Sequence, residues 1–587
     1  MANKSIFKSV SNTKATATKS SRVASVTNDA GGKAYESSHR HALAQIAATN
    51  CFNGTFYASA DANLERAKQA VLAMKDDPEF IAKVAIYARD KGYMKDMPAF
   101  ITVMLADIDS KLFRQVFRKV VDNGKMLRNV IQIARSGATG RKYNVSAGAF
   151  RRAIQEWFDS KSPFAVFKAS IGNDPSMRDI LRMAHVKPND AAKAAMLAYV
   201  YGAEYDAETN KLIVRGKNGQ IRYTHDFALL PPDVQKFEDF KRAGGGEIPK
   251  IDFRFLSSLE IGEAGWKDIA RNAPWQMTRM NLNTFARHGV FEDKDLTKLI
   301  ADRLRDKKLI VEARQFPYQI MSAYLATYGA DTSWRDSGIY LYGGAMRKAD
   351  KVEVPNAISE ALQDAMEISI DNVPSFGDGK IFVAVDTSGS MTSAVTGYRN
   401  GSTTNVSCVQ VAGLFASAIV RKNRDADVYT FADDAVKVSL NPRDTVITNT
   451  KKLLGNGGGT NVSSVLAKLN REGANGDAVI YVSDNESWLD RSYDYGCTGL
   501  QIEWDKFKAR NPKAKLVCID LLAHATSQVK DHKDVLQVGG FGDVVFKVVS
   551  TFLTQGLESD HWVAEIEKVN LSAQTREEAL DKVDADE

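Results

Sequence analysis

Apolar residues recur at spacings of three and four through most of the first 370 positions, as in the stripe over residues 80–88. Such spacing predicts amphipathic helices, and glycines and prolines interrupt the pattern between them. Because no matching strands intervene, we expect an α-solenoid of paired helices over residues 29–372. The other helical runs lie at 112–120, 127–134, 148–159, 190–202, 276–287, 294–305 and 317–328.

Two stretches depart from the helical pattern. Residues 205–223 show short alternation with two glycines, which favours a hairpin inserted between helices. Residues 230–250 contain paired prolines and a run of three glycines, which indicates a surface loop with one charged helix. Neither stretch carries a motif that points to a partner.

After residue 378 the pattern changes to short, continuous apolar runs. Residues 381–385 and 478–482 are rich in Val and Ile, as is typical of strands buried on both faces of a parallel sheet. The longest apolar run, 411–420, predicts a helix packed on the first of these strands, and it is far shorter than the ~20 residues that span a bilayer. We therefore expect an α/β domain over residues 378–560 and no membrane helix.

Oxygen-bearing side chains follow the two strands. Asp386, Ser388 and Ser390 come directly after the first, Asp484 ends the second, and Thr460 lies in a glycine-rich turn between them. Open α/β sheets bind ligands at the carboxyl ends of their strands, and Mg²⁺ prefers oxygen donors. The alternative is a set of ordinary polar turns.

These clusters, in this order, resemble the metal-ion-dependent adhesion site of von Willebrand factor A domains. The resemblance implies that a divalent cation, Mg²⁺, is the cofactor and that one coordination position is open to an acidic group of a protein partner. It also implies a docking site rather than a reaction centre. The ligands that it implies are Asp386, Ser388, Ser390, Thr460 and Asp484.

Composition and charge add a second picture. The chain of 587 residues is 44% hydrophobic and 26% charged, as in soluble globular proteins, and its four scattered cysteines suit a reducing cytoplasm. The net charge of +6 is uneven: residues 380–560 are neutral, an acidic tail at 561–587 carries −5, and residues 1–379 carry +11. Residues 1–28 supply +5 of this as a flexible basic arm. The helical half is therefore the basic half.

Basic residues also cluster locally. Arg178, Arg182 and His185 are predicted to line the outer face of one helix, with Lys187 just before Pro188. Clustered Lys and Arg are what phosphate binding requires, although a solvated charged face is the alternative. Further candidates are Lys111, Arg114 and Arg118 on another helix, and Arg141 and Lys142 between two helices.

A basic helical half followed by a von Willebrand factor A domain resembles the Ro ribonucleoprotein family, whose N-terminal part is the TROVE module. The resemblance is carried by residues 178–188, 280–285, 313–318 and 483–486. It implies a ring of HEAT-like repeats that binds Y-like noncoding RNAs on its outer surface, through Arg178, Arg182, His185 and Lys187. It further implies binding of single-stranded 3′ ends of misfolded RNAs, in RNA quality control by a monomer, with an exoribonuclease as a possible partner.

Catalysis is not expected. The sequence has no Gly-Lys-Ser/Thr phosphate loop, no His-Glu-x-x-His and no nucleophile elbow. A protein-docking scaffold that uses the metal site without RNA is the alternative function. The salt dependence of binding distinguishes RNA binding from protein docking, because phosphate binding weakens steeply as ionic strength rises.

Overall fold

The computed structural model describes residues 24–572 apart from 56, 217, 245, 257–258, 260, 314–316, 328–353, 398–405, 455–456, 488, 490–496, 523 and 556–560. Most of the predicted basic arm, part of the 313–318 motif and the end of the acidic tail lie outside the described residues. The chain forms two compact units. One comprises Met1–Ala73, Pro274–Arg287 and Phe291–Lys568, and the other comprises Met74–Ala273, His288–Val290 and Val569–Glu587.

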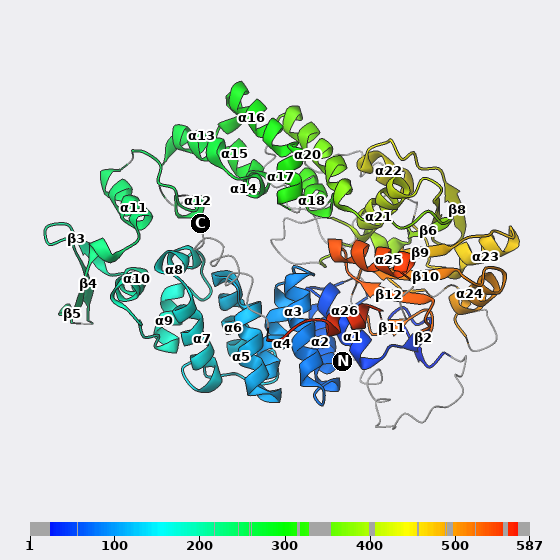
Figure 1. Ribbon diagram of the computed structural model, residues 1–587, viewed down its shortest axis with the longest axis horizontal. Coiled ribbons are helices and arrows are strands. Elements are labelled where there is room, and N and C mark those ends of the chain that lie inside the picture. The colour runs from blue at the N-terminus through cyan, green and yellow to red at the C-terminus, as the bar shows by residue number, and fades with distance from the viewer. Residues whose placement is uncertain are drawn as a thin grey trace. The chain divides into compact units, whose positions relative to one another are not determined.

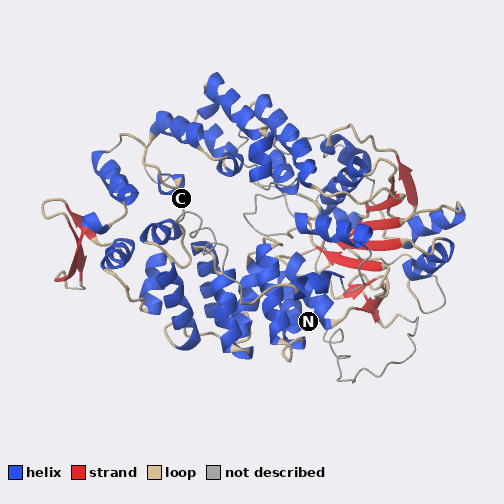
Figure 2. Ribbon diagram, viewed as in Figure 1, coloured by secondary structure: helices blue, strands red, loops and turns tan. Residues whose placement is uncertain are grey.

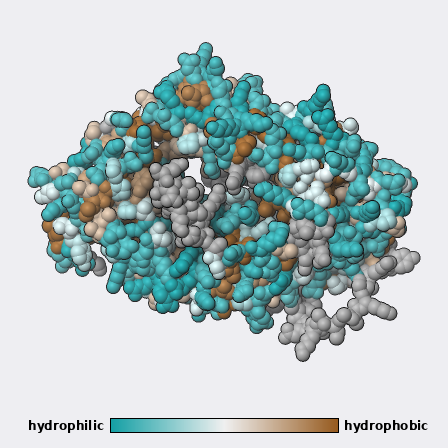
Figure 3. Space-filling view, in the orientation of Figure 1, coloured by the Kyte–Doolittle hydropathy of each residue, from teal (hydrophilic) through white to brown (hydrophobic). Residues whose placement is uncertain are grey.

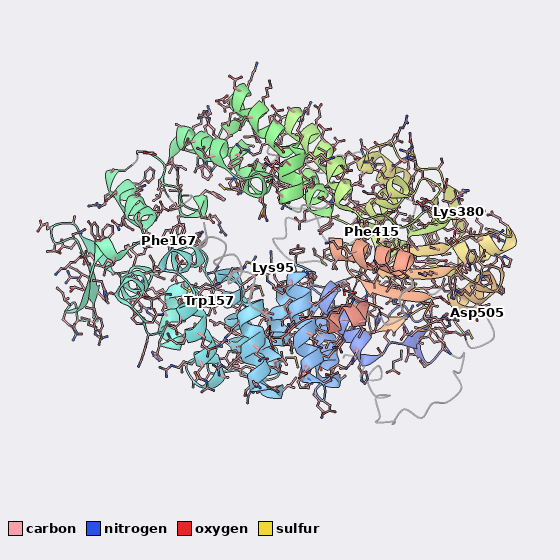
Figure 4. The ribbon with its side chains drawn as sticks, viewed as in Figure 1. Lys95, Trp157, Phe167, Lys380, Phe415 and Asp505 are labelled. Atoms are coloured by element: carbon pink, nitrogen blue, oxygen red, sulfur yellow. The ribbon has the colours of Figure 1, made fainter. Side chains whose placement is uncertain are left out.

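The second unit is built mainly of helices that pack against their neighbours in sequence (Figure 2). In α5, the residues at the predicted spacing, Leu112, Val116 and Val120, are buried. Trp157 of α7 and Phe167 of α8, labelled in Figure 4, are buried as well. The helices are α3 (Pro78–Asp90), α4 (Asp96–Ile108), α5 (Ser110–Val120), α6 (Gly124–Ser136), α7 (Gly148–Ser160), α8 (Pro163–Ala169), α9 (Met177–Ala184), α10 (Ala191–Tyr201), α11 (Pro232–Ala243), α12 (Phe253–Leu256) and α13 (Gly262–Asn272).

The predicted hairpin is present in this unit. Strands β3 (Glu204–Asp206), β4 (Lys211–Arg215) and β5 (Ile221–Asp226) form an antiparallel sheet in that order. A 3₁₀ turn, η1 (Phe227–Leu229), links the sheet to α11, which is the charged helix expected within residues 230–250. The structure therefore confirms both departures from the helical pattern.

The first unit contains a six-stranded sheet of order β12-β10-β9-β6-β7-β8 (Figure 1). All neighbouring strands are parallel except β7 and β8, which pair antiparallel at one edge. Every residue of β6 and β9 is buried, as their continuous apolar runs predict. The strands are β6 (Ile381–Asp386), β7 (Asp427–Phe431), β8 (Ala435–Val438), β9 (Ala478–Ser483), β10 (Lys515–Asp520) and β12 (Val535–Gly539).

Helices cover both faces of this sheet. On one face Leu466, Trp504 and Phe507 pack with alternate strand residues. On the other, Phe415 of α21 stacks on Phe546 of α25 with ring centroids 4.4 Å apart (Figure 4). The fold is thus a mostly helical N-terminal region followed by an α/β domain, which confirms the predicted class. The helices are α21 (Cys408–Lys422), α22 (Val446–Leu453), α23 (Ser463–Arg471), α24 (Gly499–Arg510), α25 (Asp543–Gln555) and α26 (His561–Glu567).

The N-terminal segment packs on the α/β domain. Strand β2 pairs with β11, with Glu36 opposite Thr526, and the Gln45 side chain of α1 donates to Asp520 at 3.3 Å. These pairings join residues more than 470 positions apart. The other described elements of this unit are β1 (Val26–Thr27), β2 (Lys33–Glu36), β11 (Thr526–Ser527), α1 (His39–Thr49), α2 (Ala60–Ala73), α14 (Trp275–Met280), α15 (Leu282–Arg287), α16 (Lys294–Leu304), α17 (Lys307–Glu312), α18 (Pro317–Thr327), α20 (Asn356–Ser369), η3 (Ile370–Asn372) and η4 (Gly389–Thr392). The 3₁₀ turn η2 (Val290–Glu292) begins with the last residue of the second unit's His288–Val290 segment.

The surface is largely polar. Figure 3 shows hydrophilic residues over most of the visible face, with hydrophobic ones scattered among them. Large exposed apolar side chains include Met280 and Tyr223, which are 67% and 65% exposed. No helix in the described part of the chain is both long and apolar enough to cross a membrane.

Candidate metal centre and nucleic-acid interface

The candidate metal centre begins where β6 ends. One carboxylate oxygen of Asp386 accepts a hydrogen bond from the Ser388 amide at 2.9 Å, and the other accepts from the Ser483 hydroxyl at 2.6 Å. The hydroxyls of Ser388 and Ser390 lie 3.3 Å apart. These contacts gather a carboxylate and two hydroxyls at the carboxyl end of the strand.

Asp484 follows β9, the strand that pairs with β6. The side chain is fully buried, and within the described residues neither of its carboxylate oxygens accepts a well-aligned hydrogen bond, although the Ser390 hydroxyl lies close enough to lower its pKa. Burial and the charge of Asp386 raise the pKa of Asp484 to about 7, and burial also raises the pKa of Asp386. Two buried, adjacent carboxylates are unfavourable unless a cation or a proton compensates them.

Thr460 lies in the loop before α23, and the contacts of this loop bring it to the same edge. The Gly389 amide donates to the Gly458 carbonyl at 3.2 Å, and the Ser487 hydroxyl donates to the Thr460 carbonyl at 3.2 Å. All five predicted ligand residues are at most 3% exposed. The orphaned oxygens of Asp484 and the all-oxygen donor set fit a hard divalent cation such as Mg²⁺.

The basic residues of α9 lie on its exposed face. A capping box between Ser176 and Asp179 starts the helix, and the side chains of Met177, Ile180, Leu181 and Ala184 are buried. The guanidinium groups of Arg178 and Arg182 lie 5.5 and 5.0 Å from the ring centroid of Tyr201. Arg182 Nε also donates to the Tyr201 hydroxyl at 3.3 Å. One aromatic ring therefore orients two cations.

The other two predicted residues follow the helix directly. His185 is exposed and ends α9 in the left-handed conformation, with φ 51°. The main chain of Lys187 is held by Gln155 of α7 through hydrogen bonds of 2.9 and 2.8 Å, so its exposed side chain extends from a fixed point. In the described structure Arg178, Arg182 and Lys187 form no ion pair, and the Asp179 carboxylate bonds to Ser176 instead.

The remaining predicted cations are partly neutralised. Arg114 and Arg118 of α5 both pair with Glu156 of α7, the latter at 3.1 Å. With Lys111 and Arg152 they line a cavity of about 290 Å³. Arg141 pairs with Asp107 at 2.5 Å, and Lys142 is exposed beside it. The sequence shows the cations of α5 but not that a carboxylate of α7 faces them.

Comparisons with known proteins agree with this architecture. Residues 380–553 match the family model of the Ro60 vWA domain. The RNA-binding protein RO60 of Deinococcus radiodurans is 23% identical over 546 residues, covering 90% of this chain and 95% of that protein. The crystal structure of the D. radiodurans RO (RSR) protein matches with a TM-score of 0.58 at 18% identity, over 89% of this chain and 100% of the other. The chain therefore contains a domain of the Ro60 vWA type over residues 380–553 and is similar to Ro proteins over most of its length.

Sequence analysis missed a tyrosine at the metal centre. The Tyr57 hydroxyl bonds to Ser390, and burial together with the charge of Asp484 raises the pKa of Tyr57 above its usual range. The loop after α1 is fixed in place, because the Asn53 amide donates to the Thr396 carbonyl at 2.6 Å and the Asn63 amide donates to the Asn53 carbonyl at 2.8 Å. No local pattern marks Tyr57, since its partner is more than 300 residues away.

Proposed function

We propose that this chain is a Ro-type protein that binds RNA phosphates through the α9 surface, defined as Arg178, Arg182 and Lys187. The observation that carries the proposal is the pair of guanidiniums oriented by Tyr201, neither of which forms an ion pair within the described residues. The D. radiodurans relative, which is named an RNA-binding protein, supports the assignment. His185 is adjacent and exposed, where it can donate to a phosphate or stack on a base.

The geometry suits phosphate recognition for a physical reason. Guanidinium groups donate two parallel hydrogen bonds to a phosphate, and groups that are already oriented lose less entropy on binding. Each neutralised phosphate also releases counterions, which makes the affinity depend strongly on salt. The cavity lined by Lys111, Arg114 and Arg118 offers a secondary contact, which Glu156 weakens.

The finer function rests on the family resemblance. The preferred ligands are small structured, Y-like noncoding RNAs and the single-stranded 3′ ends of misfolded RNAs, in noncoding RNA quality control in the cytoplasm, with an exoribonuclease as a possible partner. The chain acts as a binding scaffold rather than as an enzyme. Its exposed cations on helix ends are suited to positioning RNA.

The metal centre supplies a second, docking role. Asp386, Ser388, Ser390, Thr460 and Asp484 would hold Mg²⁺, which when bound offers a coordination position to an acidic group of a protein partner. The orphaned carboxylate of Asp484 supports this role. The same feature favours the second candidate function, a protein-docking scaffold that uses the metal centre without RNA.

The deciding experiment compares two triple variants in a gel-shift titration with a structured RNA that has a free 3′ end. Replacing Arg178, Arg182 and Lys187 with Ala should weaken binding at least about tenfold and reduce the salt slope by about 0.7–0.9 per lost phosphate contact. The matched control removes three other exposed cations, Lys294, Lys298 and Lys308, with the same change in net charge. Equal weakening by both variants would contradict the assignment to α9.

A further inference from the structure

A tight turn near the N-terminus docks beside the metal centre. The Asn28 amide donates to the Ser487 carbonyl at 2.8 Å, and the Ala30 amide donates to Glu486 Oε2 at 2.9 Å. Gly32 passes so close that a Cβ atom there would overlap the Ser487 carbonyl oxygen. These contacts fix the turn and hold Asp29 over the end of β9.

Asp29 thereby meets Glu486 and His524. One ligand atom from each of the three side chains lies within 4.8 Å of the other two. His524 Nδ1 is 2.8 Å from Glu486 Oε1 and 3.8 Å from Asp29 Oδ2. Glu486 is fully buried and His524 is 5% exposed, so water reaches neither side chain freely.

The ligand atoms of this trio lie close together but form no well-aligned hydrogen bonds with one another. Among the described residues, Glu486 Oε1 and both ring nitrogens of His524 lack a hydrogen bond of acceptable geometry, despite the short distance between Nδ1 and Oε1. In a tetrahedral site with bonds of about 2.1 Å, neighbouring ligand atoms are separated by roughly 3.4 Å. The separations of 2.8 and 3.8 Å from His524 Nδ1 to Glu486 and Asp29 bracket this spacing, so small side-chain adjustments would let the three atoms share an ion.

The surrounding charge favours a cation. Asp520, Asp484 and Asp386 lie in the same buried region as Glu486 and Asp29. Arg66 of α2 pairs with Asp29 at 2.6 Å. Burial lowers the pKa of His524, but the charges of Glu486 and Asp29 outweigh it and raise this pKa to about 10, so the trio attracts positive charge.

We propose that Asp29, Glu486 and His524 bind a second divalent cation, of the Zn²⁺ or Mn²⁺ class, beside the all-oxygen metal centre. An imidazole nitrogen with two carboxylates suits a transition ion better than Mg²⁺. Because Asp29 comes from the N-terminal turn, this ion would fasten that turn to the α/β domain. The inference does not depend on RNA binding.

The test uses the full chain, stripped with a chelator and titrated with Zn²⁺ in excess Mg²⁺, which occupies the all-oxygen centre. One Zn²⁺ per chain is expected. His524→Gln should weaken Zn²⁺ binding at least about tenfold, and Asp29→Asn should do the same. His532→Gln is the matched control, because the His532 side chain is 57% exposed and pairs with Asp534 rather than with a member of the trio. Asp386→Ala should retain the Zn²⁺.

Three results would overturn the proposal. The first is no Zn²⁺ bound by the wild-type chain in excess Mg²⁺. The second is unchanged Zn²⁺ affinity in a folded His524→Gln or Asp29→Asn variant, because Zn²⁺ would then bind elsewhere. The third is a lower melting temperature in these variants when the wild type binds no Zn²⁺. The trio would then be an ion pair that stabilises the fold. If His524→Gln fails to fold, the Zn²⁺ affinity of Asp29→Asn decides between the outcomes, because the Asp29 side chain is only partly buried.

Discussion

The α9 surface and the metal centre carry opposite charges in opposite environments. The α9 surface is cationic and exposed, and its side chains come from α9 and the loop that follows it. The metal centre is anionic and buried, and its side chains come from segments nearly 100 residues apart. Water therefore solvates the positive charges of the α9 surface, which remain available to bind an anion. The buried negative charges of the metal centre are not solvated, so a bound cation or protonation must compensate them.

Asp386→Ala should separate the two regions most sharply. Removing this carboxylate takes away a ligand and one of the two buried charges, so Mg²⁺ binding should fall by at least about 100-fold. RNA affinity should change by less than about twofold, because α9 contributes no ligand. Isothermal titration with Mg²⁺ and a gel shift on the same preparation measure the two effects. A parallel loss of RNA binding in folded protein would show that the regions are coupled.

The pH dependence of stability should distinguish the metal-free centre from a filled one. The pKa of Asp484 is raised to about 7 in the folded chain, above its value of about 4 when unfolded. The folded state then holds the proton more tightly, so stability is greatest below pH 4 and is lost as pH rises towards 7, by up to about 4 kcal/mol from this group.

Denaturant titrations between pH 4 and 8 with a chelator would measure this loss. Mg²⁺ should remove most of it, since the cation compensates the ionised carboxylates. A chelated protein whose stability rises through the same range would contradict the raised pKa. Asp484→Asn, which cannot ionise, serves as the control and should remove the part of the loss that this group contributes.

Tyr57→Phe should have a smaller effect that is confined to the metal centre. The substitution keeps the ring and removes the hydroxyl that bonds to Ser390. A hydrogen bond of this kind contributes about 1 kcal/mol, so Mg²⁺ affinity should weaken about fivefold. Tyr93→Phe is the matched control, because Tyr93 is 48% exposed. Tighter Mg²⁺ binding in Tyr57→Phe would mean that the hydroxyl instead competes with the ion.

The same contrast explains what the sequence could predict. The α9 surface is encoded locally, so helical spacing alone identifies Arg178 and Arg182 as outward-facing, and the strand ends identify Asp386 and Asp484. Tyr57 and Asp29 could not be found in this way, because tertiary packing brings them to partners hundreds of residues away. The short strand β2 was missed for the same reason, since its partner β11 lies near the other end of the chain.

The cations of α5 provide the finest test, because they differ from those of α9 chiefly in having a carboxylate partner. Glu156 pairs with both Arg114 and Arg118 in a partly exposed setting, where ion pairs contribute little to stability. Glu156→Gln should therefore leave the fold intact, release two guanidiniums and tighten RNA binding by about two- to threefold at low salt. Asp239→Asn, which removes a carboxylate paired with Arg242 on α11, is the matched control for the change in charge. If both variants tighten RNA binding equally, the change in net charge rather than the α5 cavity causes the effect. The α9 surface would then be the remaining candidate for the RNA contact.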